Sequence, residues 1–239
     1  MELIQLAVPV LLKGLWMTLA LTVISVAIGF TLGLGLAILR GSENRWLSGF
    51  ARYYSITLRG TPLLVQIFLI YYGLGQIKFV HDVPALWWVV SEGSRCAVLA
   101  LALNTAAYTS EILRGGLVSV PVGLVEAAKA CGMSRGKRFW RIEFPLAFRQ
   151  ALPAYGNELV LMVKGTSLAS TITVLEITGY AKRLMSQTFA IFEVFAIAGV
   201  LYLMLNLALI GLVRLVERRL MRHTRPVPQS ASGHAVKAL

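Results

Sequence analysis

The chain has 239 residues, of which 57% are hydrophobic and 14% are charged, and its mean hydropathy is +0.71. A soluble core of this size cannot absorb so much apolar surface, so these values exclude a soluble globular protein and indicate one membrane domain. The net charge of +12 comes from Lys and Arg that gather in short segments between apolar runs, a pattern typical of membrane topology signals and not of a nucleic-acid-binding surface.

Five uncharged or nearly uncharged stretches predict an all-α protein with five transmembrane helices. We expect the first to be a span and not a signal peptide, because Glu2 stands where a signal peptide needs a basic start. In this span Gly29, Gly33 and Gly35 include a GxxxG spacing, which lets another helix approach closely. The spans lie near residues 14–39, 60–77, 96–113, 150–175 and 194–213, within a transmembrane domain of residues 1–225.

The basic residues between the spans predict how the chain is oriented, because loops rich in Lys and Arg stay in the cytoplasm. One set of connections holds 17 of them, among which Arg40, Arg45, Arg52 and Arg59 follow the first span. The opposite set holds five. We therefore expect a periplasmic N-terminus and a cytoplasmic C-terminus, with residues 226–239 forming a flexible cytoplasmic tail.

The predicted cytoplasmic loop at residues 114–149 has the pattern of a folded segment. Pro121 suits the start of a helix, and the Ala-rich stretch 124–131 favours a helical conformation. Gly132 can adopt a positive φ and end that helix, and Ser134 can cap a second basic helix. Pro145 is expected to stop this second helix.

The same loop carries a specific resemblance. Glu126, Ala127 and Ala128, followed by Gly132 and then by Ile142 and Pro145, resemble the EAA loop of ABC importer permeases. In that family the loop is the coupling helix that docks on the ATP-hydrolysing subunit. The resemblance therefore implies a type I ABC importer permease whose ATPase-coupling residues are Glu126, Ala127, Ala128 and Gly132.

Further motifs occur along the rest of the chain. They are the segments 59–66 (RGTPLLVQ) and 104–108 (NTAAY), the residues Glu111, Arg114, Gly115 and Gly116, and the segments 157–158 (NE), 164–168 (KGTSL) and 171–173 (TIT). With these motifs the chain resembles the permeases for polar amino acids, over most of its length from Trp16 to Arg219. Within that family it is most similar to the permeases for histidine, lysine, arginine or opines. It departs from many family members at Gly165, where they carry Asp.

The resemblance implies alternating access in a bacterial inner membrane. A periplasmic solute-binding protein would deliver the amino acid to two permease subunits, either a homodimer or a pair of relatives. An ABC ATPase dimer beneath them would hold ATP and Mg²⁺, so this chain would need no cofactor of its own.

Polar groups in the second to fourth spans can line a substrate pathway, because such groups are costly in a membrane and are commonly functional. Substrate contact and interhelical hydrogen bonding are both open for them. Glu158 is the candidate for binding a cationic side chain, with Lys164 as a competing structural partner. The candidates are Asn104, Tyr108, Glu158, Thr166 and Ser167.

No catalytic or metal-ligating constellation is present in the sequence, since the three histidines show no HExxH spacing and no GxSxG motif occurs. The alternative function is an ion-coupled secondary amino acid transporter. Such transporters commonly contain an internal repeat, and no convincing repeat is found in this sequence.

Overall fold

The computed structural model describes residues 2–220, and these form helices with no strand among them. The predicted tail at 226–239 lies outside the described residues. The helical elements are α1 (Glu2–Arg40), α2 (Arg45–Gly60), α3 (Leu63–Phe68), η1 (Leu69–Gly73), η2 (Leu74–Gln76), α4 (Lys78–Asp82), α5 (Pro84–Val90), α6 (Gly93–Val118), α7 (Val122–Ala130), α8 (Arg135–Arg138), η3 (Phe139–Glu143), α9 (Phe144–Gly165), η4 (Thr166–Ile172), α10 (Ile177–Thr188) and α11 (Ile191–Leu220).

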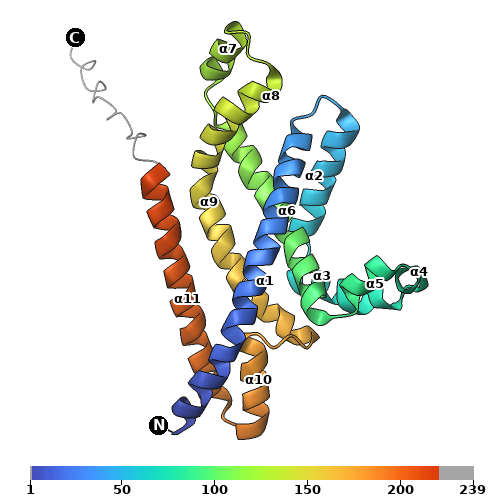
Figure 1. Cartoon of the computed structure of the whole chain (residues 1–239), viewed down its shortest axis with the longest axis vertical. Coiled ribbons are helices and arrows are strands. Elements are labelled where there is room, and N and C mark those ends of the chain that lie inside the picture. Colours follow the sequence, from blue (N-terminus) through green and yellow to red (C-terminus); the bar gives the residue numbers. More distant parts are fainter. Residues whose placement is uncertain (1, 221–239) are drawn as a thin grey trace, which may run out of the picture.

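The centre of the molecule is the packing of α1 against α6, and α9 packs against α6 as well (Figure 1). Gly29 and Gly33 make the close approach of α1 possible. A Cβ atom at Gly29 would lie 2.1 Å from Thr105 Cγ2, and one at Gly33 would lie 2.9 Å from the Ala106 carbonyl oxygen. The glycine spacing in the first span thus marks a helix contact, as expected from the sequence.

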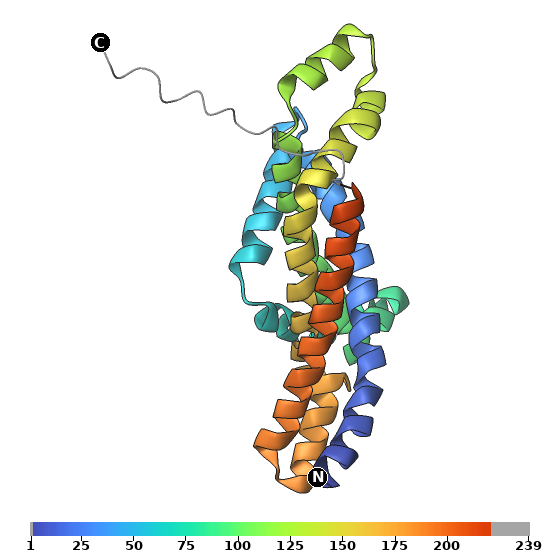
Figure 2. The same ribbon diagram turned by 90° about the vertical axis from the view of Figure 1, so that its left-hand side faces the viewer.

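At the end of the molecule that carries the N-terminus, α10 packs against both α1 and α11 (Figures 1 and 2). A buried apolar cluster that includes Leu11, Ile177 and Val194 holds these three helices together. Glu176, which is fully buried, caps α10 by accepting hydrogen bonds from the amides of Thr178 and Gly179 at 2.9 and 2.8 Å. The helices α1, α10 and α11 therefore share an apolar core of their own, separate from the packing of α1 against α6.

Within residues 2–220, three helices are long and apolar enough to cross a membrane, namely α1, α6 and α11. The segment Arg135–Ile172 joins them as a fourth if it is taken together with α10, from which it is bent by 47°. The expected span at 60–77 coincides with the short apolar stretch Leu63–Gln76, which is too short to cross a bilayer alone. The count of five spans is therefore not reproduced by helix length and composition.

The segment before that short stretch is a helix, α2, that the hydropathy pattern did not predict. Asn44 caps it by accepting a hydrogen bond from the Trp46 amide at 2.9 Å, and Ala51 and Ser55 form its buried face. Thr61 and Pro62 adopt extended backbone conformations and end it. The chain then resumes as α3, so α2 and α3 form one broken helical path beside α6 (Figure 1).

The predicted loop at 114–149 begins in the end of α6 and finishes in the start of α9, and its middle part forms a small helical lobe at the opposite end of the molecule from the N-terminus (Figure 1). Its first helix, α7, starts directly after Pro121, as expected. Gly132 has a φ of +71°, which confirms the predicted left-handed conformation. The amides of Gly132 and Met133 donate to the carbonyl oxygens of Lys129 and Ala128 at 2.9 and 3.1 Å, which is the Schellman arrangement at a helix end.

The expectation that Pro145 stops the second loop helix is wrong. Helical structure runs from Arg135 to Gly165 through α8, η3 and α9, and Pro145 lies in the first turn of α9. The turn before it, η3, is a π-helix, which is wider than an α-helix and tolerates the missing proline amide. Ser134 occupies the predicted capping position, but its side chain makes no capping hydrogen bond.

Candidate functional site

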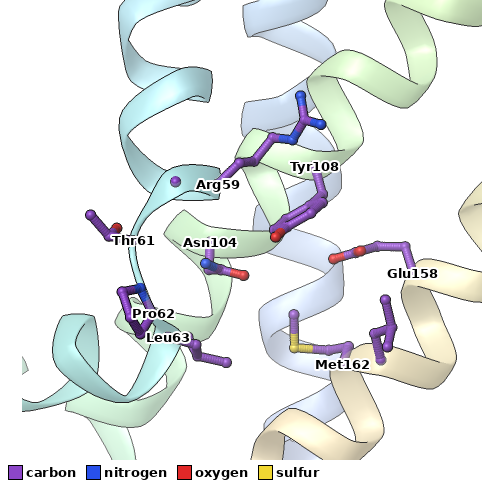
Figure 3. A pocket seen from close by; sticks show the side chains of 10 residues that line it. Arg59, Thr61, Pro62, Leu63, Asn104, Tyr108, Glu158 and Met162 are labelled. Atoms are coloured by element: carbon purple, nitrogen blue, oxygen red, sulfur yellow. The ribbon is translucent and has the colours of Figure 1, made fainter.

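A pocket of about 430 Å³ opens where the α2–α3 break faces the middle of α6 and the second half of α9. Its walls combine charged and polar side chains with apolar ones such as Leu63 and Met162 (Figure 3). Three of the five predicted pathway residues line it, and they come from two different helices. These are Asn104 and Tyr108 of α6 and Glu158 of α9.

Glu158 is the acidic member of this pocket. Its side chain is 5% exposed, and its Oε1 atom accepts a hydrogen bond from Thr105 Oγ1 at 2.9 Å. The carboxylate points from α9 toward Tyr108 (Figure 3). Lys164, the competing partner considered from sequence, is exposed and forms no ion pair with Glu158 in the described part of the chain. One hydrogen bond leaves most of the acceptor capacity of the carboxylate free for a ligand.

Arg59 supplies the positive charge of the pocket, and the sequence analysis missed this role. Arg59 was counted there among the basic residues of a cytoplasmic connection. The structure places it instead in the last turn of α2, with its guanidinium carbon 5.4 Å from the centre of the Tyr108 ring (Figure 3). This distance is within the range of a cation–π interaction. The sequence feature that could have indicated this role is that Arg59 lies one turn before Pro62, where the helix ends.

Asn104 of α6 connects α2 and α3 at the wall of the pocket through hydrogen bonds. Its Nδ2 atom donates to Gln66 Oε1 at 3.0 Å and to the Leu58 carbonyl oxygen at 3.3 Å. Gln66 Nε2 in turn donates to the Leu58 carbonyl oxygen at 2.7 Å and to Thr61 Oγ1 at 2.8 Å. These bonds satisfy polar groups that the break between α2 and α3 exposes. Asn104 therefore shapes the pocket through its amide nitrogen, in addition to lining it.

Thr166 and Ser167 lie apart from the other three predicted pathway residues, in η4. Thr166 is fully buried and donates to the Val163 carbonyl oxygen at 2.7 Å. Ser167 donates to the Lys164 carbonyl oxygen at the same distance. Neither lines the pocket of Glu158. Substrate contact by any of the five residues stays a prediction.

The predicted ATPase-coupling residues lie on α7 and in the turn after it. Glu126, Ala127 and Gly132 are exposed, so they are accessible to a partner. Ala128 is 4% exposed and faces the interior of the chain. Val122 and Leu124, which the sequence analysis did not single out, are 67% and 46% exposed at the start of the same helix. Apolar side chains exposed on a projecting helix are suited to a protein contact.

Comparisons with known proteins agree with this architecture. Residues 29–222 match the family described as the binding-protein-dependent transport system inner membrane component. The chain is 51% identical over 232 residues to the octopine transport system permease protein OccM of Rhizobium radiobacter, which covers 94% of each protein. It is 42% identical over 217 residues to the arginine ABC transporter permease protein ArtM of Escherichia coli strain K12, which covers 91% of this chain and 97% of the relative.

Among solved structures, the chain resembles an amino acid ABC transporter crystallised with histidines, with a TM-score of 0.77 and 36% sequence identity. The match covers 88% of this chain and 94% of that one. The inward-facing MetNI methionine ABC transporter gives a TM-score of 0.75 at 20% identity, covering 91% of this chain and 98% of that one. At that identity the likeness concerns the fold.

Proposed function

The chain belongs to the family of binding-protein-dependent transport system inner membrane components and is an ABC transporter permease, and we propose that it carries a basic amino acid or an opine into the cytoplasm. The family assignment removes the alternative of an ion-coupled secondary transporter. The relatives named for octopine and arginine transport support the proposed substrate class.

The observation that carries the proposal is the pairing of opposite charges across one pocket. Glu158 offers a buried carboxylate on α9, and Arg59 offers a guanidinium on α2. A basic amino acid has a cationic side chain at one end and a carboxylate at the other. Glu158 would bind the cationic group and Arg59 the carboxylate, because hydrogen bonds between ionised groups are the strongest that a side chain can make. Tyr108 and Asn104 of α6 would hold the α2 wall of the pocket in place, through Arg59 and the Leu58 carbonyl oxygen.

The crossings of the membrane follow from the broken helices. In this proposal α2 and α3 together supply the second crossing, and the segment from α9 into α10 supplies the fourth. The N-terminus then lies in the periplasm and the α7–α8 lobe in the cytoplasm. The connections on the same side of the membrane as the lobe contain more Lys and Arg than those on the opposite side, which supports this orientation.

The lobe would transmit movement from a separate ATPase subunit, on which the complex hydrolyses ATP with Mg²⁺. Glu126 and Ala127 would contact that subunit, while the buried Ala128 and the left-handed Gly132 would fix the shape of the turn. A second permease, either the same chain or a relative, would complete the pathway. A periplasmic binding protein would deliver the substrate.

The test is ATP hydrolysis by the co-purified permease and ATPase in proteoliposomes that contain the binding protein. Arginine, lysine, histidine, octopine, glutamine and leucine would be added singly. We expect arginine, lysine or octopine to stimulate hydrolysis more than glutamine and leucine do. Stimulation by the neutral amino acids alone would contradict the substrate class and leave the family assignment intact.

A further inference from the structure

A second pocket, distinct from that of Glu158, lies at the lobe end of the helix bundle. It has a volume of about 420 Å³ and lies between the end of α1, the first half of α2 and the end of α6. Three arginines line it, one from each of these helices: Arg40, Arg52 and Arg114. The apolar residues Leu117 and Val118 complete one wall, and Val118 is 73% exposed.

The charges of this arginine pocket do not cancel. Glu111 is the acid that contacts it, with one carboxylate oxygen 3.3 Å from Arg40 Nη2 and the other 2.9 Å from Arg114 Nε. Arg52 has no ion-pair partner within residues 2–220. The Nη1 atom of Arg40 is buried and has no hydrogen-bond partner in the same part of the chain. Three guanidinium groups and one carboxylate leave an excess of positive charge that an anion would offset.

The outer face of α2 indicates the depth of the arginine pocket in the membrane. Trp46, Phe50 and Tyr53 are 87%, 61% and 72% exposed, and their spacing places them on one face of the helix. Trp and Tyr are enriched where a bilayer meets water. Since Arg52 lies on the same two turns of α2, the arginine pocket opens at the level of the lipid headgroups.

We propose that the arginine pocket binds the phosphate of an anionic phospholipid such as phosphatidylglycerol. Guanidinium groups bind phosphate oxygens in pairs of parallel hydrogen bonds, which suits a phosphodiester held between Arg52 and Arg114. Basic pockets between transmembrane helices are the sites at which anionic headgroups bind.

The bound lipid would bridge three helices close to the α7–α8 lobe. The turn between α1 and α2 already contacts the lobe, because Glu43 Oε1 lies 2.7 Å from Arg135 Nη2 of α8. A headgroup in the arginine pocket would join α2 to the ends of α1 and α6 on the same side. The lipid would therefore hold the base of the lobe in place.

The test is native mass spectrometry of the intact transporter in detergent, titrated with phosphatidylglycerol or with phosphatidylethanolamine. We expect wild type to retain phosphatidylglycerol preferentially and Arg52→Gln to retain about fivefold less, as removal of one cation near an anionic surface predicts. Arg45→Gln is the matched control, since Arg45 is an exposed arginine of α2 outside the pocket. Arg52→Lys, which keeps the charge, should retain an intermediate amount.

Three outcomes would overturn the proposal. Equal losses in Arg52→Gln and Arg45→Gln would show a diffuse charge effect. Displacement of the lipid by millimolar inorganic phosphate would show a site for small anions. If wild type retains no lipid and Arg52→Gln releases the ATPase subunit, the pocket binds a carboxylate of that subunit instead.

Discussion

Thr105 on α6 donates a hydrogen bond to Glu158 on α9, with 2.9 Å between Thr105 Oγ1 and Glu158 Oε1. This bond ties the carboxylate of Glu158 on α9 to the neighbouring helix α6. The same Thr105 packs against Gly29 of α1, so the orientation of Glu158 depends on the contact between α1 and α6. The charge of the pocket is thereby linked to the central helix packing.

Glu158→Gln should lower uptake of arginine about tenfold or more while changing uptake of a neutral amino acid much less. The reason is that a hydrogen bond to a charged partner contributes roughly 1.5–3 kcal/mol, and the amide keeps the shape of the side chain without its charge. Initial uptake rates in proteoliposomes measure this. Glu193→Gln, which removes an exposed carboxylate at the start of α11, is the control. An equal fall for both substrate classes would favour a structural role for Glu158.

Gly132→Asp should abolish uptake while the protein still inserts in the membrane. A side chain at the φ of +71° strains the turn by roughly 1 kcal/mol, and an added carboxylate must be desolvated on docking. Gly136→Asp adds the same charge in the first turn of α8, where the backbone is helical and acidic residues are favoured. Uptake and retention of the ATPase subunit on membranes give the measurement. If Gly132→Asp leaves both at wild-type levels, this turn is not the coupling element.

Gly33→Leu should destabilise the protein, and Gly35→Leu should not. A Cβ at Gly33 would lie 2.7 Å from Thr109 Cβ, whereas one at Gly35 meets nothing within 4 Å. Overpacking of this kind costs about 1–3 kcal/mol, and here it would also push α1 away from α6. Thermal unfolding of the two purified variants in the same detergent gives the comparison. Equal melting temperatures would show that α1 and α6 do not need this close contact.

The native Cys131 provides a test of orientation, because it is exposed in the turn after α7 while Cys96 is buried. If the lobe is cytoplasmic, an impermeant thiol reagent should label Cys131 only after the membrane is permeabilised. A cysteine at Ser91, exposed between α5 and α6, should be labelled in intact cells when Cys131 is replaced by Ser. Labelling of Cys131 in sealed cells would reverse the proposed topology.

The sequence predicted the helices that are apolar along their whole length, because hydropathy alone identifies them. The hydropathy pattern did not reveal α2, because Arg45, Arg52 and Arg59 are interspersed among its apolar residues. A segment with that many charges is assigned to a loop between spans when spans are identified by their lack of charge. The left-handed turn at Gly132 was predictable because glycine adopts that conformation at low cost. The continuous helical path through Pro145 was not predictable, because it depends on the π-helical turn η3, for which the sequence contains no recognisable pattern.

The pocket was predictable in part. Asn104, Tyr108 and Glu158 stood out as polar groups in apolar spans, and the structure brings them together. Thr166 and Ser167 stood out for the same reason, but their hydroxyl groups bond to helix carbonyl oxygens outside the pocket. A list of intramembrane polar residues cannot separate the two groups, because both roles satisfy the same need for hydrogen bonds.

The break at Pro62 also has an electrostatic consequence. A helix carries about half a negative charge at its C-terminal end, where the last carbonyl groups lack helical partners. The end of α2 lies in the pocket wall at Arg59 and Gly60, so the helix dipole partly offsets the guanidinium charge of Arg59 on the wall that faces Glu158. If α2 were continuous with α3, the negative end of the helix dipole would lie beyond the pocket. Pro62 therefore determines where the electric field of the α2 dipole acts, in addition to bending the chain.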